Sequence, residues 1–411
     1  MQDQGELDLA DARLRLLGSS RAALVVYVGC GLTLLCTLLV LVVSAIVTSG
    51  DGPRAMSNDF RVFWAAGQMA LDGDFLGVFD TDRLTAVHGV DPEYWMPWLY
   101  PPGFLFLIAP LGALGFTTGF AILSLLSVAL MALAIRPFVA GSKVAWLAFS
   151  LAPAYLPILV QGQNGLLWLA GLVAALAALR TDRWVLAGVF IGLLTLKPQY
   201  GLLIPVALLA AGLWWTVLSA SVTALIVAAV PTIWTGLDYW SLFLRRMGEY
   251  SDYITATMPT LILAASPFAM FVRLGLDPET AFVGQAVVTV AAAFCVFLIW
   301  RSRQLCFDTK AASLLIASFL AAPVTWYNEA AIMALVGLFL VRAGILGRTS
   351  SQWLLLAVLW FGAGWQSMGI FLGLADKQFP WALVTTPVML LCLALCLSRY
   401  LAVRRTPVWG A

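Results

Sequence analysis

The chain is a succession of long apolar runs separated by short polar breaks. The first run follows a polar head of residues 1–21 and covers residues 22–49 without a charge. It is too long for the core of a signal peptide, and it exceeds the about 20 apolar residues that span a bilayer. The later runs do not alternate between apolar and polar residues, as the strands of a membrane barrel do. The pattern therefore predicts an all-α polytopic membrane protein.

The apolar runs predict about twelve transmembrane helices, with ten to thirteen as the range. They cover residues 22–49, 103–135, 144–160, 165–180, 184–197, 199–213, 216–233, 279–300, 311–325, 328–341, 352–372 and 381–398. Several are shorter than about 20 residues, so we expect them to pack against other protein or to line a cavity. The run 103–135 is too long for one crossing and is interrupted at PLGALGFTTG, which is compatible with a re-entrant or interfacial first half.

Charged residues are scarce and unevenly placed. They make up 11% of the 411 residues, against 62% hydrophobic residues, whereas soluble domains carry about 25% charged residues. Most of the 23 lysines and arginines fall on one side of the membrane if the N-terminal head is cytoplasmic, as the positive-inside rule demands. We expect a protein of the inner, cytoplasmic membrane with both termini in the cytoplasm.

This topology divides the chain into a cytoplasmic segment (1–21), one transmembrane domain (22–405) and a cytoplasmic tail (406–411). Two large segments, residues 51–102 and about 234–278, then lie outside. Both mix aromatic residues with charges, which is typical of amphipathic helices on the bilayer surface. The sequence shows no convincing internal repeat, which weighs against an inverted-repeat transporter.

The composition excludes several kinds of site. His88 is the only histidine, which excludes a His-ligated metal and a Ser-His-Asp triad. The six cysteines show no metal-ligand spacing. The acids of DGD (72–74) and DTD (80–82) suit turns, with a divalent cation as the alternative. We expect no metal and no other cofactor, and the net charge of +2 gives no indication of nucleic acid.

The stretch SNDFRVFWAAGQ (57–68) places a carboxylate, Asp59, shortly after the first membrane helix. Such an acid is either a solvated loop residue or helix cap, or the base of a reaction at the membrane surface. Arg61, two residues later, is a candidate for binding an anion. A second basic candidate is the pair Arg245–Arg246, which suits either a lipid phosphate or a structural ion pair.

Lys197 is the most unusual charge in the sequence. It stands in LLTLKPQYG (193–201), 14 residues after Arg183, which places it about 20 Å from the cytoplasmic end of its helix. A lysine inside the membrane costs several kcal/mol unless it is paired or snorkels to the surface, so it is a functional candidate. A phosphate is the natural partner of a lone ammonium group.

Further polar and aromatic groups are expected at the same outer face. Their plain interpretations are interfacial anchors and polar turns; the functional one is a wall that binds a sugar or an acceptor, by stacking and by amides that both donate and accept. They lie in LYPPGF (99–104), QGQNG (161–165) and APVTWYNEA (322–330), and the residues are Tyr100, Gln163, Asn164, Trp326, Tyr327 and Asn328.

Together these groups predict the transfer of a sugar from a lipid phosphate to a hydroxyl group. A carboxylate removes the proton of the hydroxyl, and cations stabilise the departing phosphate. The alternatives are a transporter or flippase of a lipid-linked or polar solute, and a membrane scaffold. A buried Lys197 speaks against the scaffold, and the missing repeat speaks against the transporter.

The sequence also resembles glycosyltransferase family 87 from residue 55 to about residue 340. The segments that carry the resemblance are SNDFRVFWAAGQMALDG with GVFD, LYPPGFLFLIAPLGAL, GQNGLLWLAGLVAAL, AGVFIGLLTLKPQYGLLIPVALL and PVTWYNEA. The family belongs to the GT-C superfamily of multi-helix membrane enzymes and includes α-mannosyltransferases that extend phosphatidylinositol mannosides.

The resemblance implies that Asp59 is the catalytic base. It further implies a metal-independent, inverting transfer of mannose from a polyprenyl phosphate donor to a glycolipid or glycan acceptor on the extracytoplasmic face. Two departures concern the acceptor. Many members carry histidines where this chain has Tyr327 and Asn328, and their Val-Tyr-Asp is here Val78-Phe79-Asp80.

Overall fold

The structure is a computed structural model that describes residues 12–14, 18–51, 59–89, 95–139, 141–371 and 379–405. The predicted tail 406–411 and most of the predicted segment 1–21 lie outside these residues. The described chain is helical apart from turns and one isolated antiparallel bridge between Ala264 and Trp326. The all-α prediction is confirmed.

Six stretches of the described chain are long and apolar enough to cross a membrane. They lie in α2 (Ser20–Asp51), α6 (Phe116–Ile135), the pair α7 (Lys143–Ser150) and α8 (Leu156–Gln161), α12 (Trp214–Thr235), α15 (Pro278–Arg301) and α20 (Ala382–Arg405). Shorter apolar helices are α5 (Pro102–Gly112), α9 (Gly165–Arg180), α10 (Trp184–Leu193), which continues into the 3-10 turn η6 (Leu194–Leu196), and α18 (Ser350–Phe361). The protein is thus a membrane-embedded helical bundle, whereas the count of about twelve crossings remains a prediction.

Two of the predicted short spans form the centre of the bundle. In α17 (Ile332–Arg342) every residue is buried, and in α16 (Phe307–Ala321) all residues from Asp308 onward are buried except Lys310. The peripheral helices α12 and α15 instead expose large apolar side chains such as Leu225 and Val290. The structure therefore confirms that these two short spans pack against protein, and it leaves the longer helices to face lipid.

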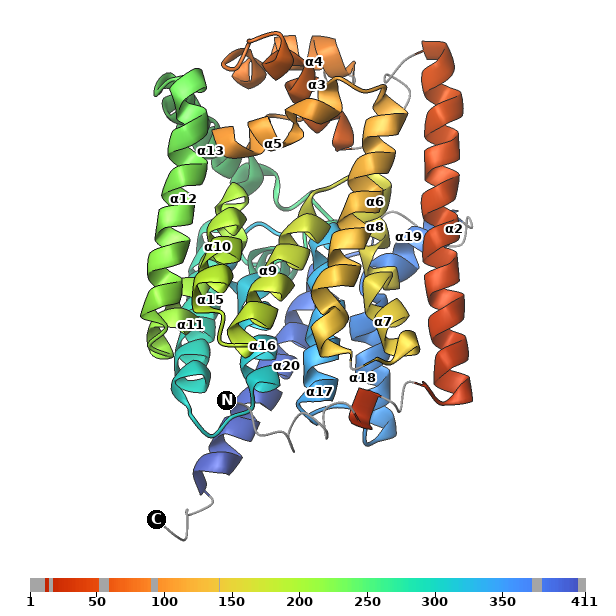
Figure 1. Ribbon diagram of the computed structural model, residues 1–411, viewed down its shortest axis with the longest axis vertical. Coiled ribbons are helices and arrows are strands. Elements are labelled where there is room, and N and C mark those ends of the chain that lie inside the picture. Colours follow the sequence, from red (N-terminus) through yellow and green to blue (C-terminus); the bar gives the residue numbers. More distant parts are fainter. Residues whose placement is uncertain are drawn as a thin grey trace.

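The predicted outer segments gather at one end of the bundle. Figure 1 shows α3 (Phe60–Leu71), α4 (Thr81–His88), α5 and α13 (Asp238–Thr257) together at the top. The break expected in residues 103–135 is present, because α5 ends at Gly112 and α6 begins at Phe116. A Cβ on Gly112 would lie 2.4 Å from the backbone nitrogen of Gln68, so glycine is what lets α5 cross closely over α3.

A buried ion pair fixes the opposite end. Arg342 Nε of α17 lies 2.9 Å from Asp308 Oδ1 of α16, and its guanidinium also donates to the carbonyl of Phe138.

The remaining helices are α11 (Ile204–Ala210), α14 (Pro267–Arg273) and α19 (Gly364–Phe371), with 3-10 turns η3 (Gly77–Phe79), η4 (Arg136–Phe138), η5 (Pro153–Tyr155), η7 (Pro198–Gly201) and η8 (Tyr327–Ala331).

Candidate active site

Asp59 lies at the N-cap position of α3, but its side chain does not cap the helix. Its Oδ2 instead accepts a 2.6 Å hydrogen bond from Nε2 of Gln163, which stands between α8 and α9. Asp59 itself is half-buried, and the next residue, Phe60, is fully buried and stacks on Phe120 with ring centroids 5.6 Å apart. The aromatic packing thus anchors the start of α3 and directs the carboxylate toward the turn 161–165.

Glycine at position 162 makes this contact possible. Gly162 ends α8 with φ +66°, and a Cβ there would lie 2.5 Å from Cβ of Phe60. The left-handed backbone and the close approach both favour glycine. The turn 161–165 therefore rests directly on α3 and brings Gln163 to Asp59.

Lys197 is buried, with 7% of its side chain exposed, and it lies where η6 meets η7. Its Nζ lies 2.9 Å from Oε1 of Glu329 and donates to Oδ1 of Asn164 at 3.2 Å. Asn164 occupies the N-cap position of α9 without capping it. An intramembrane ammonium is thus paired and hydrogen-bonded, as such a charge requires.

Glu329 is the second carboxylate of the site, and the sequence analysis did not single it out. Its Oε1 pairs with Lys197, and its Oε2 accepts from the backbone nitrogen of Trp326 at 2.8 Å. The sequence signal was an acid three residues after Trp326, the spacing of a capping box. The two carboxylates therefore differ in kind: Glu329 is ion-paired, whereas Asp59 accepts from a neutral amide.

Aromatic residues from three other parts of the chain surround these charges. Tyr100, just before α5, packs on Phe104 with ring centroids 4.4 Å apart. Tyr250 of α13, also missed by the sequence analysis, places its hydroxyl 3.3 Å from Nε1 of Trp326. Asn328 donates to Oε1 of Gln161 at 2.8 Å, which ties η8 to the turn 161–165.

The electrostatics favour a proton-accepting carboxylate among neutral hydroxyl groups. Loss of hydration raises the pKa of Asp59 and the Glu329 charge raises it further, while the Gln163 hydrogen bond and the Lys197 charge oppose the rise. Burial also raises the pKa of Tyr327 to about 12. The same cause raises the pKa of Tyr100 and of Tyr250. All three phenols are therefore neutral hydrogen-bond donors at pH 7.

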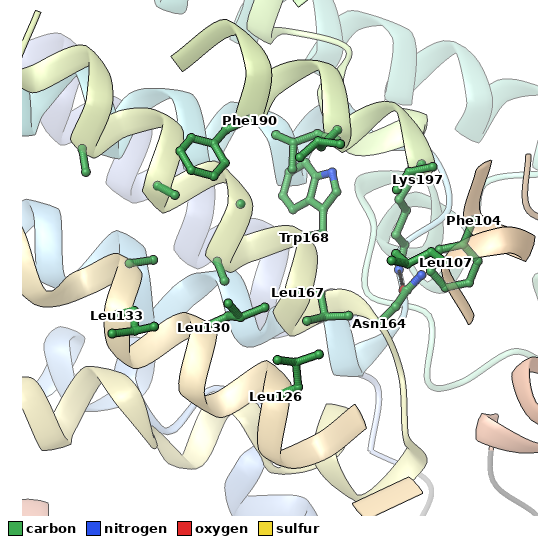
Figure 2. A pocket seen from close by; sticks show the side chains of 18 of the residues that line it. Phe104, Leu107, Leu126, Leu130, Leu133, Asn164, Leu167, Trp168, Phe190 and Lys197 are labelled. Atoms are coloured by element: carbon green, nitrogen blue, oxygen red, sulfur yellow. Dashed lines mark hydrogen bonds between the residues drawn. The ribbon is translucent and has the colours of Figure 1, made fainter. Parts of the chain in front are cut away.

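A cavity of about 770 Å³ adjoins this cluster and runs between α5, α6, α9 and α10. Lys197 and Asn164 lie at one end of it near Phe104, while Leu126, Leu130 and Leu133 of α6 continue its wall away from them (Figure 2). Leu126 is 49% exposed and Leu133 is 63% exposed, so this wall reaches the surface of the bundle. The cavity is therefore a largely apolar channel with Lys197 and Asn164 at one end.

The other predicted cations have different partners. Arg61 is fully buried and donates to the carbonyl of His88 at 3.1 Å, and it points away from Asp59 because two residues turn a helix by about 200°. Arg246 pairs with Glu249 Oε2 at 2.8 Å and also donates to the carbonyl of Phe79. Arg245 is exposed on α13. The structure thus places Lys197 close enough to Asp59 for its charge to lower the pKa of that carboxyl. Arg61 and Arg246 instead hold α3, α4, η3 and α13 together.

The acid-rich turns of the first outer segment serve as caps. Asp80 accepts hydrogen bonds from the backbone nitrogens of Asp82 and Arg83 and so caps α4. Asp74 accepts from the backbone nitrogen of Gly77 at 3.1 Å and pairs with Arg83. These contacts fit the interpretation of DGD and DTD as turns.

A comparison with protein families gives a match to glycosyltransferase family 87 over residues 98–324, more than half of the chain. Tyr100, Gln163, Asn164, Lys197 and Tyr250 fall within the match, whereas Asp59 precedes it and Glu329 follows it. Neither the curated proteins nor the solved structures contain a match. The chain belongs to glycosyltransferase family 87 and is a membrane glycosyltransferase.

Proposed function

We propose that the protein transfers a sugar, with mannose as the first candidate, from a polyprenyl phosphate to a hydroxyl group of a lipid or glycan. The observation that carries the proposal is that Asp59, held by the Gln163 amide, lies within the electrostatic influence of Lys197. Lys197 is buried and stands at one end of an apolar channel. The channel suits the prenyl chain, and the lysine suits the phosphate.

In the proposed reaction Asp59 accepts the proton of the acceptor hydroxyl. The hydroxyl oxygen then forms a bond to the anomeric carbon while the bond from that carbon to the phosphate oxygen breaks, and the lipid phosphate leaves with the electron pair. Lys197 stabilises the negative charge that develops on it. A single displacement inverts the anomeric carbon, so a β-linked donor gives an α-linked product. The raised pKa of Asp59 makes it a stronger base than an ordinary carboxylate.

The aromatic and amide groups around these two residues are the proposed binding surface for the sugar and the acceptor. Trp326, Tyr100 and Tyr327 offer apolar faces and neutral hydroxyl donors, and Asn164 and Gln163 offer amides. We propose that the reaction needs no metal, because Lys197 supplies the positive charge. The active site then faces the extracytoplasmic side of the inner membrane, opposite to both termini.

The test uses purified protein in nanodiscs with polyprenyl phosphate mannose and an envelope lipid extract as acceptor. Wild type should consume the donor and form a new mannolipid, and Asp59→Asn should do neither. Asp72→Asn, which changes an exposed acid at the end of α3, is the matched control and should remain active. Turnover by Asp59→Asn at the wild-type rate would remove Asp59 as the base. If the protein consumed another polyprenyl phosphate sugar and not the mannose donor, mannose would be the wrong sugar, and the proposed type of reaction would stand.

A further inference from the structure

A second cavity lies at the end of the bundle opposite to Asp59, the end that the basic residues predict to be cytoplasmic. It has a volume of about 800 Å³ and is bordered by three connections between helices and by the helix ends that they join. These are residues 181–183 between α9 and α10, residues 211–213 between α11 and α12, and residues 302–306 between α15 and α16. The proposed reaction uses nothing in this cavity.

The lining of this cavity is strongly basic. Four basic side chains and one acid line it: Arg180, Arg301, Arg303, Lys310 and Asp182. Arg180 is engaged in holding the fold, because it donates to the carbonyl of Pro137 at 2.9 Å and lies over the ring of Phe138. The positive-inside rule accounts for basic residues at this end, but not for their gathering around one hollow.

Three helices begin at this cavity, and their first turns lack side-chain caps. The N-cap residues of α10, α12 and α16 are Arg183, Leu213 and Cys306, and none of them caps its helix with its side chain. Leu213 and Cys306 themselves line the cavity. The start of a helix presents backbone N–H groups and a partial positive charge, which adds to the attraction of an anion.

The rim of the cavity has the composition of a membrane interface. Trp184 and Trp300 line it, and Trp214 and Trp215 follow Leu213 with 66% and 67% of their surface exposed. Leu209, also in the lining, is 49% exposed. Tryptophans gather at the level of lipid headgroups, so the basic hollow opens where the phosphates of the bilayer lie.

We propose that this cavity binds the phosphate headgroup of an anionic phospholipid from the leaflet on that side. Arg301, Arg303 and Lys310 would contact the phosphate diester, the uncapped first turns of α12 and α16 would add N–H donors, and the acyl chains would lie along the exposed face near Leu209. Basic pockets between membrane helices recognise anionic headgroups in this way. The site is separate from the proposed reaction, so the failure of either proposal leaves the other intact.

Native mass spectrometry in a neutral detergent tests this site directly. Wild type is titrated with phosphatidylglycerol, with phosphatidylcholine and with soluble glycerol phosphate. The variant Arg301→Gln/Arg303→Gln/Lys310→Gln removes three cations of the cavity. Its control, Arg348→Gln/Arg399→Gln/Arg405→Gln, removes three exposed cations from helices and loops that do not line it.

We expect the first variant to bind phosphatidylglycerol roughly a hundredfold more weakly, given the usual contribution of each basic residue near a lipid surface. The control should bind as wild type does, and neither variant should change the binding of phosphatidylcholine. An equal loss in both variants would reduce the effect to general surface charge and overturn the site. Competition by glycerol phosphate at the same concentration would overturn the lipid as the ligand. Should the triple variant not fold, Arg303→Gln alone changes an exposed residue and should weaken binding about fivefold.

Discussion

The carboxylate of Asp59 accepts a 2.6 Å hydrogen bond from the side-chain amide of Gln163, although the two residues are 104 positions apart. The amide holds Oδ2, and so it fixes the orientation of the whole group. The other oxygen, Oδ1, is the one that we expect to take the proton of the acceptor. The contact explains how a residue at a helix start is positioned for the proposed role of base.

Replacement of Gln163 and of Glu329 should shift the pH dependence in opposite directions. The Gln163 hydrogen bond lowers the pKa of Asp59, whereas the Glu329 charge raises it. Gln163→Leu should therefore move the acidic limb of the profile of kcat/KM to higher pH, and Glu329→Gln should move it to lower pH. Shifts in the same direction would show that the limb belongs to another group.

Asp59→Asn should abolish turnover and at the same time stabilise the fold at neutral pH. The folded protein raises the pKa of Asp59 above its unfolded value, so ionisation of Asp59 destabilises the folded state as the pH rises through the folded pKa. The gain in Tm of the variant over wild type in detergent should thus grow from pH 4 to pH 8. A constant difference across this range would contradict the raised pKa.

A double variant can separate the structural role of the Lys197–Glu329 pair from the proposed catalytic role of Lys197. Lys197→Met leaves a buried carboxylate unpaired and should cost about 3–5 kcal/mol of stability. Lys197→Met/Glu329→Gln should recover most of this stability, because no charge is then left alone. The double variant should still lack transferase activity, since the cation for the phosphate is missing. Recovery of activity together with stability would limit Lys197 to a structural role.

Gly162→Ala should damage both the fold and the reaction. The new Cβ would lie 2.5 Å from Cβ of Phe60, and the alanine would have to adopt the left-handed φ of +66°. Gly141 is a matched control, because it has φ +71° and nothing within 4 Å of its ideal Cβ. Gly141→Ala should show the backbone strain alone, of about 1 kcal/mol. Gly162→Ala should show a larger fall in Tm and the loss of Asp59 positioning, measured as a fall in kcat. Equal effects of the two variants would mean that the contact with Phe60 is unimportant.

The apolar channel can be tested by filling it. Ala174 of α9 lines the channel, so Ala174→Phe should raise the KM of a long-chain polyprenyl phosphate donor by about tenfold or more. The KM of a donor with a very short prenyl chain should change little, since such a chain does not reach Ala174. Val222→Phe, at an exposed site on α12, is the control and should leave both values unchanged. An equal rise for both donors would place the prenyl chain elsewhere.

The sequence allowed the helical class, the break between α5 and α6 and the main candidates of the site to be predicted. Lys197 and Asp59 were visible because a charge in or beside an apolar run is costly and therefore conspicuous. Lys197 was expected to meet a phosphate, but its partner in the fold, Glu329, was not chosen. Acids are common in polar turns such as the one that contains Glu329. Only the fold shows that Lys197 lies beside it.

The roles of the arginines could not be predicted from the sequence for the same reason. Arg61 lies two residues after Asp59 in the sequence, yet it binds the His88 carbonyl on another side of α3. Tyr250 reaches the site from α13 through a hydrogen bond with Trp326, and nothing in the spacing of α13 indicates that contact. Positions along one helix can be read from periodicity, but contacts between segments far apart depend on packing.

The complete burial of α17 has a consequence for how the enzyme responds to its bilayer. Glu329 stands immediately before this helix, and α16 leads to Trp326 from the other side. Both helices are shielded from lipid by their neighbours, so changes in bilayer thickness or tension act first on peripheral helices such as α12. The ion pair of Lys197 and Glu329 is therefore mechanically insulated from the lipid bilayer. Such insulation suits the donor proposed above, whose prenyl chain would reach the site from the bilayer.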